Sequence, residues 1–435
     1  MNICMFTNTY LPHVGGVARS VNIFAEDLRK MGHWVLIIAP VYPGCEEYDT
    51  ADSDVLRVPA IQHFTGGDFS MRIPAPFYID EKIDDFKPDI IHSHHPYLLG
   101  DSALRAAKRR RLPLIFTHHT LYEEYTHYVT KDSENMRRFA AILSTKYANM
   151  CDRVVAPSKS IENLIRQRGV KTKIIEIPTG VDTDFFSSGN GKIFRKKFGI
   201  PESAFIIGHL GRLAPEKNLD FLATAISLAM KDLPETVFLV SGDGPSKSDI
   251  HEIFQKSGLN DRLVLTGSVT GIRLADAYHA MDLFVFSSHS ETQGMVLTEA
   301  MAAGTPVIAL DAPGAREVVQ DDKNGLLLAS DSTPETFSAA VRDAVLNPEK
   351  IKKWRQATIE TAQAFSREVC AVKLQQVYES AIAKTESRDS AVSDDMDPWD
   401  SFLLAIQTEW DLIAQKAETI IETIQKSSKA KGLEE

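Results

Sequence analysis

The sequence has few cysteines and no long hydrophobic run. Its four cysteines are far apart among 435 residues and form no C-x-x-C pair, which excludes a disulfide framework and fits a reducing compartment. No apolar stretch approaches the ~20 residues that a membrane-spanning helix requires. The first residues, MNICMFTNTYLP, lack the basic leader and apolar core of a secretory signal. We therefore expect a cytoplasmic protein, with any membrane contact peripheral and at the inner face of the membrane.

Positive charge is also scarce in this chain. Lys and Arg number 48 against 59 Asp and Glu, so the formal net charge is -11. Because the phosphates of nucleic acids require a basic face, this balance argues against nucleic acid as a partner. The composition, 43% hydrophobic and 25% charged, is that of a globular protein. The length is sufficient for two domains and an appendage.

Short apolar runs alternate with amphipathic stretches in two successive series. This order of strand, helix and strand predicts parallel pairing with helices on both faces, and hence an α/β fold of two doubly wound, Rossmann-like domains. Helices are expected at Val17–Met31 and Leu98–Arg110 in the first series. The strands of the first series are expected at Ile3–Phe6, Trp34–Ala39, Ile90–Ser93, Leu114–Thr117 and Val154–Ala156. Those of the second are expected at Phe205–Leu210, Val237–Val240, Leu263–Leu265, Leu283–Phe286 and Val307–Ala309.

The chain divides by its pattern into two domains and three C-terminal segments. Residues 1–185 and 186–365 form the domains, and their join near Thr179–Lys192 is rich in Gly, Ser and Asp (SSGNG), as a linker would be. A helical stretch runs over Pro348–Lys384, and we expect its part at residues 366–386 to return to the first domain. Residues 387–398 are polar and acidic, which is typical of a flexible linker.

The tail, residues 399–426, is predicted to be an amphipathic heptad helix. Apolar residues spaced alternately four and three apart indicate a helix that packs against another apolar surface. One interpretation is packing on the protein's own body, and another is self-association through Trp399–Ile424. Membrane adsorption is disfavoured, because the polar face of the helix is acidic. The apolar positions are Trp399, Leu403, Ile406, Trp410, Ile413, Ala417, Ile420 and Ile424.

The densest motif in the chain is Ser290–Ala309, SETQGMVLTEAMAAGTPVIA. Glu291 follows a predicted strand, and Glu299 lies eight positions further on, inside a helix that begins near Gly294. The unpaired amides at such a helix start are a natural seat for an anionic diphosphate. The two carboxylates suit the hydroxyl groups of an elongated, sugar-like ligand. The alternative is a helix with an acidic first turn and a solvated glutamate.

This pair, followed by EAMAAGTPVIA, resembles the donor-site signature of the retaining glycosyltransferases of family four. That family has the GT-B fold, in which two Rossmann-like domains face each other across a cleft. The segment GHLGRLAPEKNLDFL is similar to the family's G-R-x-x-x-E-K-N motif, in which Arg212 and Lys217 match the diphosphate-binding pair. Two cations on a diphosphate stabilise the leaving group, so no metal is required. The resemblance covers roughly Met1–Lys384, and it implies that residues 1–185 bind the acceptor and residues 186–365 the donor.

The first predicted domain carries matching features. The segment TNTYLPHVGGVARSV places Gly15 and Gly16 in a strand-to-helix loop, where a side chain would block the close approach of a ligand. In the family this loop faces the donor phosphates and the acceptor. The segment FTHHTLYEEY resembles the family's T-x-H-T segment, in which His119 contacts the donor sugar near the reacting carbon. Tyr122 and Tyr125 follow in the same segment and are assigned to the acceptor.

The resemblance implies a role for each matched residue. Glu291 is expected to orient the sugar and Glu299 the ribose. Catalytic roles fall to Arg212, Lys217, Glu291 and His119. Donor binding falls to Gly16, Gly211, Gly294, Met295, Val296 and Glu299, and acceptor binding to Gly15, Tyr122 and Tyr125.

Five histidines at the ends of neighbouring predicted strands raise the question of a metal site. No H-E-x-x-H motif, acidic facial triad or Cys/His cluster accompanies them, so we expect no metal and no other cofactor. They are His92, His94, His95, His118 and His119.

The segments THHTLYEEYTHYV, IPTGVDTDFF and SETQG resemble most the lipid-glycosylating branch, with its glucosyldiacylglycerol synthases. Much of the wider family has an aromatic residue where Gln293 stands. The implied activity is retaining, metal-independent transfer of a hexose from a nucleotide diphosphate sugar to a lipid such as diacylglycerol. UDP-glucose is the first candidate donor, followed by GDP-mannose and UDP-galactose, and a soluble glycan or polysaccharide precursor is the alternative acceptor.

The clearest basic cluster, Arg105–Arg111, bears on how such an enzyme would meet a lipid. Each basic residue near an anionic surface contributes ~1 kcal/mol, so the cluster would hold the protein at a membrane. The alternative is a solvated helix end before Pro113.

Two functions of other kinds stay open. One is a nucleotide-sugar epimerase or a phosphorylase, although nothing indicates the pyridoxal lysine that a phosphorylase needs. The other is a non-catalytic scaffold that works through its C-terminal heptad helix.

Overall fold

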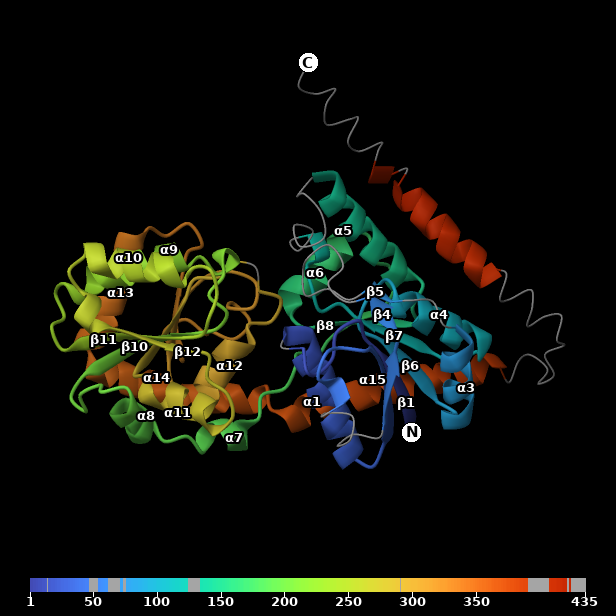
Figure 1. The fold of residues 1–435 in the computed structure, drawn as a ribbon, viewed down its shortest axis with the longest axis horizontal. Coiled ribbons are helices and arrows are strands. Elements are labelled where there is room, and N and C mark those ends of the chain that lie inside the picture. Colours follow the sequence, from blue (N-terminus) through green and yellow to red (C-terminus); the bar gives the residue numbers. More distant parts are fainter. Residues whose placement is uncertain are drawn as a thin grey trace, which may run out of the picture. The chain divides into compact units, whose positions relative to one another are not determined.

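The chain folds into two compact units. In the computed structural model the described residues are 1–13, 15–46, 54–61, 71–72, 76–123, 134–289, 291–389, 407–420 and 422–423. Unit 1 comprises Met1–Pro178 and Cys370–Glu435, and unit 2 comprises Thr179–Val369. Each unit has a main parallel sheet with helices on both of its faces (Figure 1).

Unit 1 contains a seven-stranded sheet in the order β3-β2-β1-β6-β7-β8-β9. All neighbouring strands in it are parallel, and the order reverses at β1, as in doubly wound folds. The strands are β1 (Asn2–Phe6), β2 (Trp34–Pro40), β3 (Val55–Val58), β6 (Ile90–Ser93), β7 (Leu114–Thr117), β8 (Arg153–Ala156) and β9 (Ile174–Glu176), with a separate antiparallel pair β4 (Ala60–Ile61) and β5 (Met71–Arg72). The helices are α1 (Gly16–Lys30), α3 (Pro76–Phe86), α4 (Leu99–Arg109), α5 (Glu134–Asn149), α6 (Lys159–Gln167) and α15 (Arg367–Asp389).

Unit 2 contains a six-stranded parallel sheet in the order β12-β11-β10-β13-β14-β15. Here the order reverses at β10. The strands are β10 (Phe205–Leu210), β11 (Thr236–Ser241), β12 (Leu263–Gly267), β13 (Leu283–Phe286), β14 (Val307–Leu310) and β15 (Gly325–Leu328). The helices are α7 (Thr183–Ser187), α8 (Gly191–Lys197), α9 (Leu219–Met230), α10 (Lys247–Lys256), α11 (Ile272–Ala280), α12 (Met295–Ala302), α13 (Pro334–Leu346) and α14 (Pro348–Ala364), with short 3-10 turns η3 (Pro215–Lys217) and η4 (Asn260–Arg262).

Each sheet separates two apolar clusters, because successive side chains of a strand point to opposite faces. In β1, Cys4 and Phe6 join the cluster under α4, α5 and α6, whereas Ile3 and Met5 join the cluster under α1 and α15. Strands covered on both faces are buried along their whole length, as β6 and β7 are. This double burial explains why the strands read as continuous apolar runs in the sequence.

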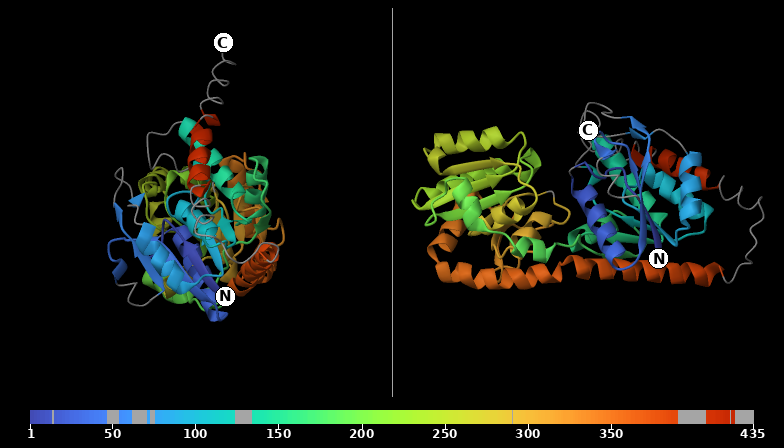
Figure 2. Two further views of the ribbon diagram at one scale, coloured as in Figure 1. Left: turned by 90° about the vertical axis from the view of Figure 1, so that its right-hand side faces the viewer. Right: turned by 60° about the horizontal axis from the view of Figure 1, so that its bottom comes forward.

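Helix α15 carries the chain from unit 2 back to unit 1. Its residues Cys370, Leu374, Tyr378 and Ala381 are buried in the cluster that also contains Ile3 and Met5. Their spacing of four, four and three places them on one face of the helix. Figure 2 shows α15 running along the body of unit 1 over most of its length. The helix ends at Asp389, and residues 390–398 of the predicted acidic linker lie outside the described residues.

The helical stretch predicted over Pro348–Lys384 consists of two helices. Helix α14 ends at Ala364 and α15 begins at Arg367, because the backbone between them pairs with another segment. The amide of Val181 donates to the carbonyl of Phe365 at 2.8 Å, and the amide of Arg367 donates to the carbonyl of Val181 at 3.1 Å. A Cβ at Gly180 would lie 2.4 Å from the Cα of Arg367. The two segments can cross this closely only because residue 180 is glycine.

The glycines of the predicted linker SSGNG also serve close packing. They flank and begin helix α8, which packs on α11. A Cβ at Gly189 would lie 2.6 Å from the carbonyl oxygen of Ala275, and a Cβ at Gly191 would lie 2.3 Å from that of His279. The glycines of this join therefore reflect tight contact between helices as well as its place beside the boundary of the two units.

The tail forms a helix over residues 407–420 and 422–423, hereafter the tail helix, and lies beside α5 in unit 1 (Figure 1). Leu412 is buried, whereas Trp410, Ile413, Ala417 and Ile420 are exposed. The interpretation that the heptad stripe packs on the protein's own body was wrong for these four residues, because the opposite face makes the contact. Self-association stays a prediction, and Trp399, Leu403, Ile406 and Ile424 lie outside the described residues. Within the part of the chain that the structure describes, no helix is both long and apolar enough to cross a membrane.

Candidate functional site

In unit 2 the predicted site residues gather where the order of the strands reverses. Strands β10 and β13 are neighbours, and the loops that follow them hold the two densest motifs of the sequence. Ligands of open parallel sheets bind at this kind of position, beyond the carboxyl ends of the strands. The hydroxyl of Ser287, directly after β13, donates to the carbonyls of Lys217 and Asn218 at 3.0 Å. One side chain thus ties the two loops together.

The structure brings Lys217 and Glu291 into direct contact. The Lys217 ammonium and a carboxylate oxygen of Glu291 are 2.5 Å apart, and both side chains are partly buried. Arg212, on the same loop as Lys217, is half-exposed and forms an ion pair with Glu216. The two predicted cations therefore lie on one loop, and each is paired with a carboxylate.

Glycines shape the backbone around this ion pair. Gly294 precedes α12 with φ +72°, and Gly314, in the loop after β14, has φ +86°. A Cβ at Gly314 would lie 2.6 Å from the Cβ of Glu291, so this glycine lets its loop press against the glutamate. Met295 and Val296 are the half-buried first residues of α12. Their amides belong to the first helical turn, which has no intrahelical acceptors.

Glu299 lies on the buried side of α12 and is 2% exposed. The hydroxyl of Tyr278 on α11 donates to its Oε2 at 2.8 Å, as a buried carboxylate requires. A role in holding ribose stays a prediction for a side chain this deeply buried.

Gly211 directly follows β10, with φ +155°, and its amide donates to the carbonyl of Ser241 at 3.0 Å. Two further glycines, in the segment GDGP, allow the neighbouring loop to pack here. A Cβ at Gly242 would lie 1.8 Å from the carbonyl oxygen of Gly211, and a Cβ at Gly244 would lie 2.2 Å from that of Leu213. The signal for this role was available in the sequence as two glycines directly after a predicted strand.

Gln293 and His209 also lie near the site, and no role was predicted for either of them. Gln293 exchanges two hydrogen bonds of 2.7 Å with the backbone of Thr179, the first residue of unit 2. An aromatic side chain, which much of the family has here, cannot make this pair of bonds. His209, at the end of β10, is buried with Nδ1 3.1 Å from the carbonyl oxygen of Val285. Burial lowers the pKa of His209 to about 4.

In unit 1 the glycine-rich loop leads into α1. Gly15 precedes the helix in an extended conformation, and Gly16 is its first residue. A Cβ at Gly16 would meet no described atom within 4 Å, so neighbouring side chains do not demand glycine there. The predicted close approach of a ligand remains a reason for its presence.

The histidines at the ends of β6 and β7 form a connected cluster. His92 bonds through Nδ1 to the hydroxyl of Tyr378 at 2.6 Å and through Nε2 to that of Thr117 at 2.7 Å. Its ring lies 4.1 Å from that of His94, and His94 Nδ1 lies 2.8 Å from His119 Nε2. His119, half-buried at the edge of the cluster, is thus positioned through neighbours that reach back to α15.

Burial governs the charge of this cluster. It lowers the pKa of His119 and of His94 well below the ordinary value, and nearby histidines lower both further. His119 is therefore neutral at pH 7. Among the described residues, no group of three or more His, Cys, Asp or Glu side chains could hold a metal ion.

The two tyrosines assigned to the acceptor have different outcomes. Tyr122 is buried, with its ring edge-on to those of Tyr97 and His118, and it belongs to the core of unit 1. Tyr125 lies outside the described residues.

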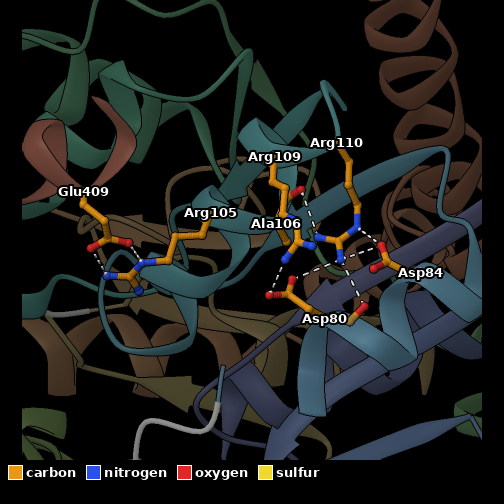
Figure 3. A network of polar contacts seen from close by, with 7 residues as sticks. All are labelled: Asp80, Asp84, Arg105, Ala106, Arg109, Arg110 and Glu409. Carbon is orange, nitrogen blue, oxygen red and sulfur yellow. Dashed lines mark hydrogen bonds and ion pairs between the residues drawn. The ribbon is translucent and has the colours of Figure 1, made fainter. Parts of the chain in front are cut away.

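The predicted basic cluster is largely paired with acids (Figure 3). Arg109 and Arg110 bind Asp80, and Arg110 also binds Asp84. The two aspartates lie on α3. Arg105 forms a two-bond ion pair with Glu409 of the tail helix. These carboxylates cancel much of the positive charge that a membrane contact through Arg105–Arg111 would use.

Because of the buried histidines, we expect the free energy of unfolding to decrease at acidic pH. Burial lowers the pKa of His92 and of His95 to about 3, so below pH 6.5 the unfolded chain binds more protons than the folded one. The free energy of unfolding should therefore fall from pH 6.5 downward, by up to about 1.4 kcal/mol per pH unit for each histidine. Urea unfolding at pH 7 and pH 5 measures this.

A pair of variants isolates the histidine contribution to that slope. His95→Asn, which keeps an acceptor for the amide of Asn8, should reduce proton uptake on unfolding by about one. His251→Asn, at an exposed position, is the matched control and should leave the slope unchanged. An equal slope in both variants would contradict the assignment.

The sequence matches described families over most of its length. The profile described as Glycosyltransferase Family 4 matches residues 14–185, and that described as Glycosyl transferases group 1 matches residues 191–361. The alpha-monoglucosyldiacylglycerol synthase of Streptococcus pneumoniae is 31% identical over 332 residues, 75% of each chain. Its counterpart in Acholeplasma laidlawii is 26% identical over 400 residues, 89% of this chain and 99% of that protein. The GDP-mannose-dependent alpha-mannosyltransferase of Mycolicibacterium smegmatis is 33% identical over 347 residues, 78% of this chain and 88% of that protein.

Solved structures agree in fold. Anabaena HepE in complex with UDP matches with a TM-score of 0.72 at 19% identity, over 87% of this chain and 100% of that chain. Sucrose-phosphate synthase from Thermosynechococcus elongatus matches with a TM-score of 0.69 at 21% identity, over 88% of this chain and 99% of that chain. Together these matches confirm the predicted fold class and activity class. The chain is a glycosyltransferase of family four with the GT-B fold, and it belongs to the glycolipid-forming branch of that family.

Proposed function

We propose that the protein transfers a hexose from a nucleotide diphosphate sugar to a lipid acceptor such as diacylglycerol, with retention of configuration and without a metal ion. UDP-glucose is the first candidate donor. The observation that carries the proposal is the Lys217–Glu291 ion pair, which lies at the switch point of the sheet beside the start of α12. Two relatives named as monoglucosyldiacylglycerol synthases support the acceptor class.

When the donor binds, its diphosphate replaces Glu291 as the partner of Lys217. A diphosphate is a stronger anion than one carboxylate and offers more acceptor oxygens, so it displaces Glu291 from the Lys217 ammonium. Arg212 on the same loop and the amides that begin α12 add further positive charge around the phosphates. Glu291, released from Lys217, then accepts hydrogen bonds from the hydroxyls of the sugar. Binding the phosphates and orienting the sugar are thereby coupled.

Transfer in this proposal proceeds on one face of the sugar. The bond between the anomeric carbon and the diphosphate oxygen breaks through an oxocarbenium-like state, while the acceptor hydroxyl attacks from the same side. The departing diphosphate takes the proton of that hydroxyl, and Lys217 and Arg212 stabilise its developing charge. The products are the glycosylated acceptor and the nucleoside diphosphate. No sugar–enzyme bond forms, which accounts for retention without a second carboxylate.

Unit 1 contributes His119 and Gly16 in this proposal, as the family resemblance implies. Because burial lowers the pKa of His119, its imidazole is neutral and does not repel the positive charge that develops on the sugar. The open space beside Gly16 admits the donor phosphates to the backbone.

GDP-mannose is the second candidate donor, and a relative named as a GDP-mannose-dependent mannosyltransferase supports it. The Lys217–Glu291 pair serves either donor, since it recognises the diphosphate and the hydroxyls of a hexose. The base of the nucleotide is bound by other groups.

A transfer assay tests the proposed function. The purified protein is incubated with UDP-glucose, GDP-mannose or UDP-galactose and with diacylglycerol in detergent micelles, with a chelator present. We expect a glycosyl-diacylglycerol with the α-anomeric linkage, identified by its proton coupling in NMR, and no loss of rate caused by the chelator. A β-linked product, or sugar interconversion without any acceptor, would contradict the proposal. The second result would favour the epimerase alternative.

Lys217→Ala tests the assignment of the leaving-group cation. Removing one preorganised group that stabilises transition-state charge lowers turnover roughly 100-fold or more, and we expect such a loss with an unchanged far-ultraviolet circular dichroism spectrum. Lys350→Ala is the matched control, because it removes another partly buried lysine of unit 2 that is paired with a carboxylate, Asp343. Equal turnover in the two variants would remove Lys217 from the mechanism.

A further inference from the structure

The tail helix places its polar side against unit 1. Its buried side chains are, apart from Leu412, polar, and two of the threonine hydroxyls return to the helix itself, to the carbonyls of Gln415 and Thr419. Gln415 donates to the carbonyl of Leu143 on α5 at 3.2 Å. The buried side chains in the described tail are Thr408, Leu412, Gln415, Thr419 and Thr423.

Ion pairs fix the helix in this orientation. Lys416 binds Asp101 of α4 at 2.6 Å, and Lys146 of α5 binds Glu418 at 2.7 Å and Glu422 at 3.2 Å. Glu409 pairs with Arg105, as Figure 3 shows. The charged groups that border the buried face are therefore engaged by unit 1, on both sides of the helix.

The opposite face is apolar and open. Trp410 is 70% exposed, Ile413 59% and Ile420 50%, and Ala417 lies between them on the same face. Their spacing of three, four and three aligns them along one side of the helix. Asp411 is also exposed, but it stands about 100° around the helix from Trp410. A water-soluble helix normally has the reverse arrangement, with its apolar stripe against the core.

We propose that this apolar face of the tail helix inserts into the surface of a lipid bilayer and holds unit 1 there. The helix would lie in the plane of the membrane, with Trp410, Ile413, Ala417 and Ile420 among the upper acyl chains and Asp411 at the headgroups. Tryptophan suits this position, since its ring is apolar and its N–H finds partners at the interface. The inference deepens the proposed function and rests on it for the reason to be at a membrane, because diacylglycerol resides in the bilayer.

Charge and area favour a bilayer over a second copy of the chain. Three of the acidic side chains that would oppose adsorption, Glu409, Glu418 and Glu422, are paired with basic residues of unit 1. Asp411 would stay at the headgroups, so the apolar face enters lipid without desolvating a carboxylate. The exposed stripe in the described tail consists of four side chains, whereas a stable protein interface uses about 20–30 residues on each side. With Arg105, Arg109 and Arg110 paired, the attraction is hydrophobic, and it does not depend on anionic lipid.

Flotation with vesicles tests the inference on the full-length protein, with no donor or acceptor present. We expect wild-type protein to float with phosphatidylcholine vesicles, and to do so equally at low and high salt, because the contact is apolar. The double variant Ile413→Glu, Ile420→Glu should lose roughly tenfold or more of this binding. Ile359→Glu, a change of the same kind at an equally exposed isoleucine of unit 2, is the matched control and should bind as wild type does.

The inference would be overturned if the wild type did not float with phosphatidylcholine vesicles, or if the double variant floated as well as the wild type. It would also be overturned if binding required anionic lipid and disappeared in salt. A double variant that only converts a dimer into monomers in sedimentation equilibrium would show that a second copy covers the face. Failure here is distinguishable from failure of the proposed function, since in detergent micelles the double variant should retain wild-type turnover.

Discussion

The proposed chemistry depends on one contact, the ion pair of Lys217 and Glu291. Two segments more than seventy positions apart along the chain supply its partners, and the adjacency of β10 and β13 brings them together. The hydroxyl of Ser287 and the glycine at residue 314 then hold both loops at contact distance. A partly buried lysine without a partner would carry a desolvation penalty. In the proposed mechanism the glutamate removes this cost until a diphosphate takes its place, and the carboxylate then becomes available to the sugar.

Most of the fold could be predicted from the sequence, because strands buried on both faces read as unbroken apolar runs. β6, β7, β10 and β13 were predicted with their observed bounds for this reason. β3, β9 and β15, three edge strands with half-buried positions, were not predicted. The boundary between residues 365 and 366 was predicted, but the reason for the break there was not. The break depends on Val181 pairing with the backbone at Phe365, a contact between distant segments that no local pattern records.

The location of the candidate site could also be predicted from the sequence, because the order of the strands determines where the loops that follow them lie. Residues in the loops that follow predicted strands, such as Arg212 and Glu291, could be assigned to one end of a sheet by topology alone. The contacts of each side chain could not be predicted, because the contacting residues come from other elements, as Tyr278 does for Glu299. The tail shows the same limit. Its heptad stripe was evident, but the choice of which face packs on unit 1 was made by ion pairs with Arg105, Asp101 and Lys146.

Calorimetric binding of UDP and of UDP-glucose to the Glu291→Gln variant tests the exchange of partners most directly. In the proposed mechanism Glu291 pairs with Lys217 until the diphosphate binds, and then binds the sugar. A glutamine at this position forms no ion pair that the diphosphate must break, but it binds the hexose hydroxyls poorly. The account predicts that Glu291→Gln binds UDP at least as tightly as wild type does, and that UDP-glucose loses its advantage over UDP. Weaker binding of UDP alone, with the preference for UDP-glucose intact, would contradict it.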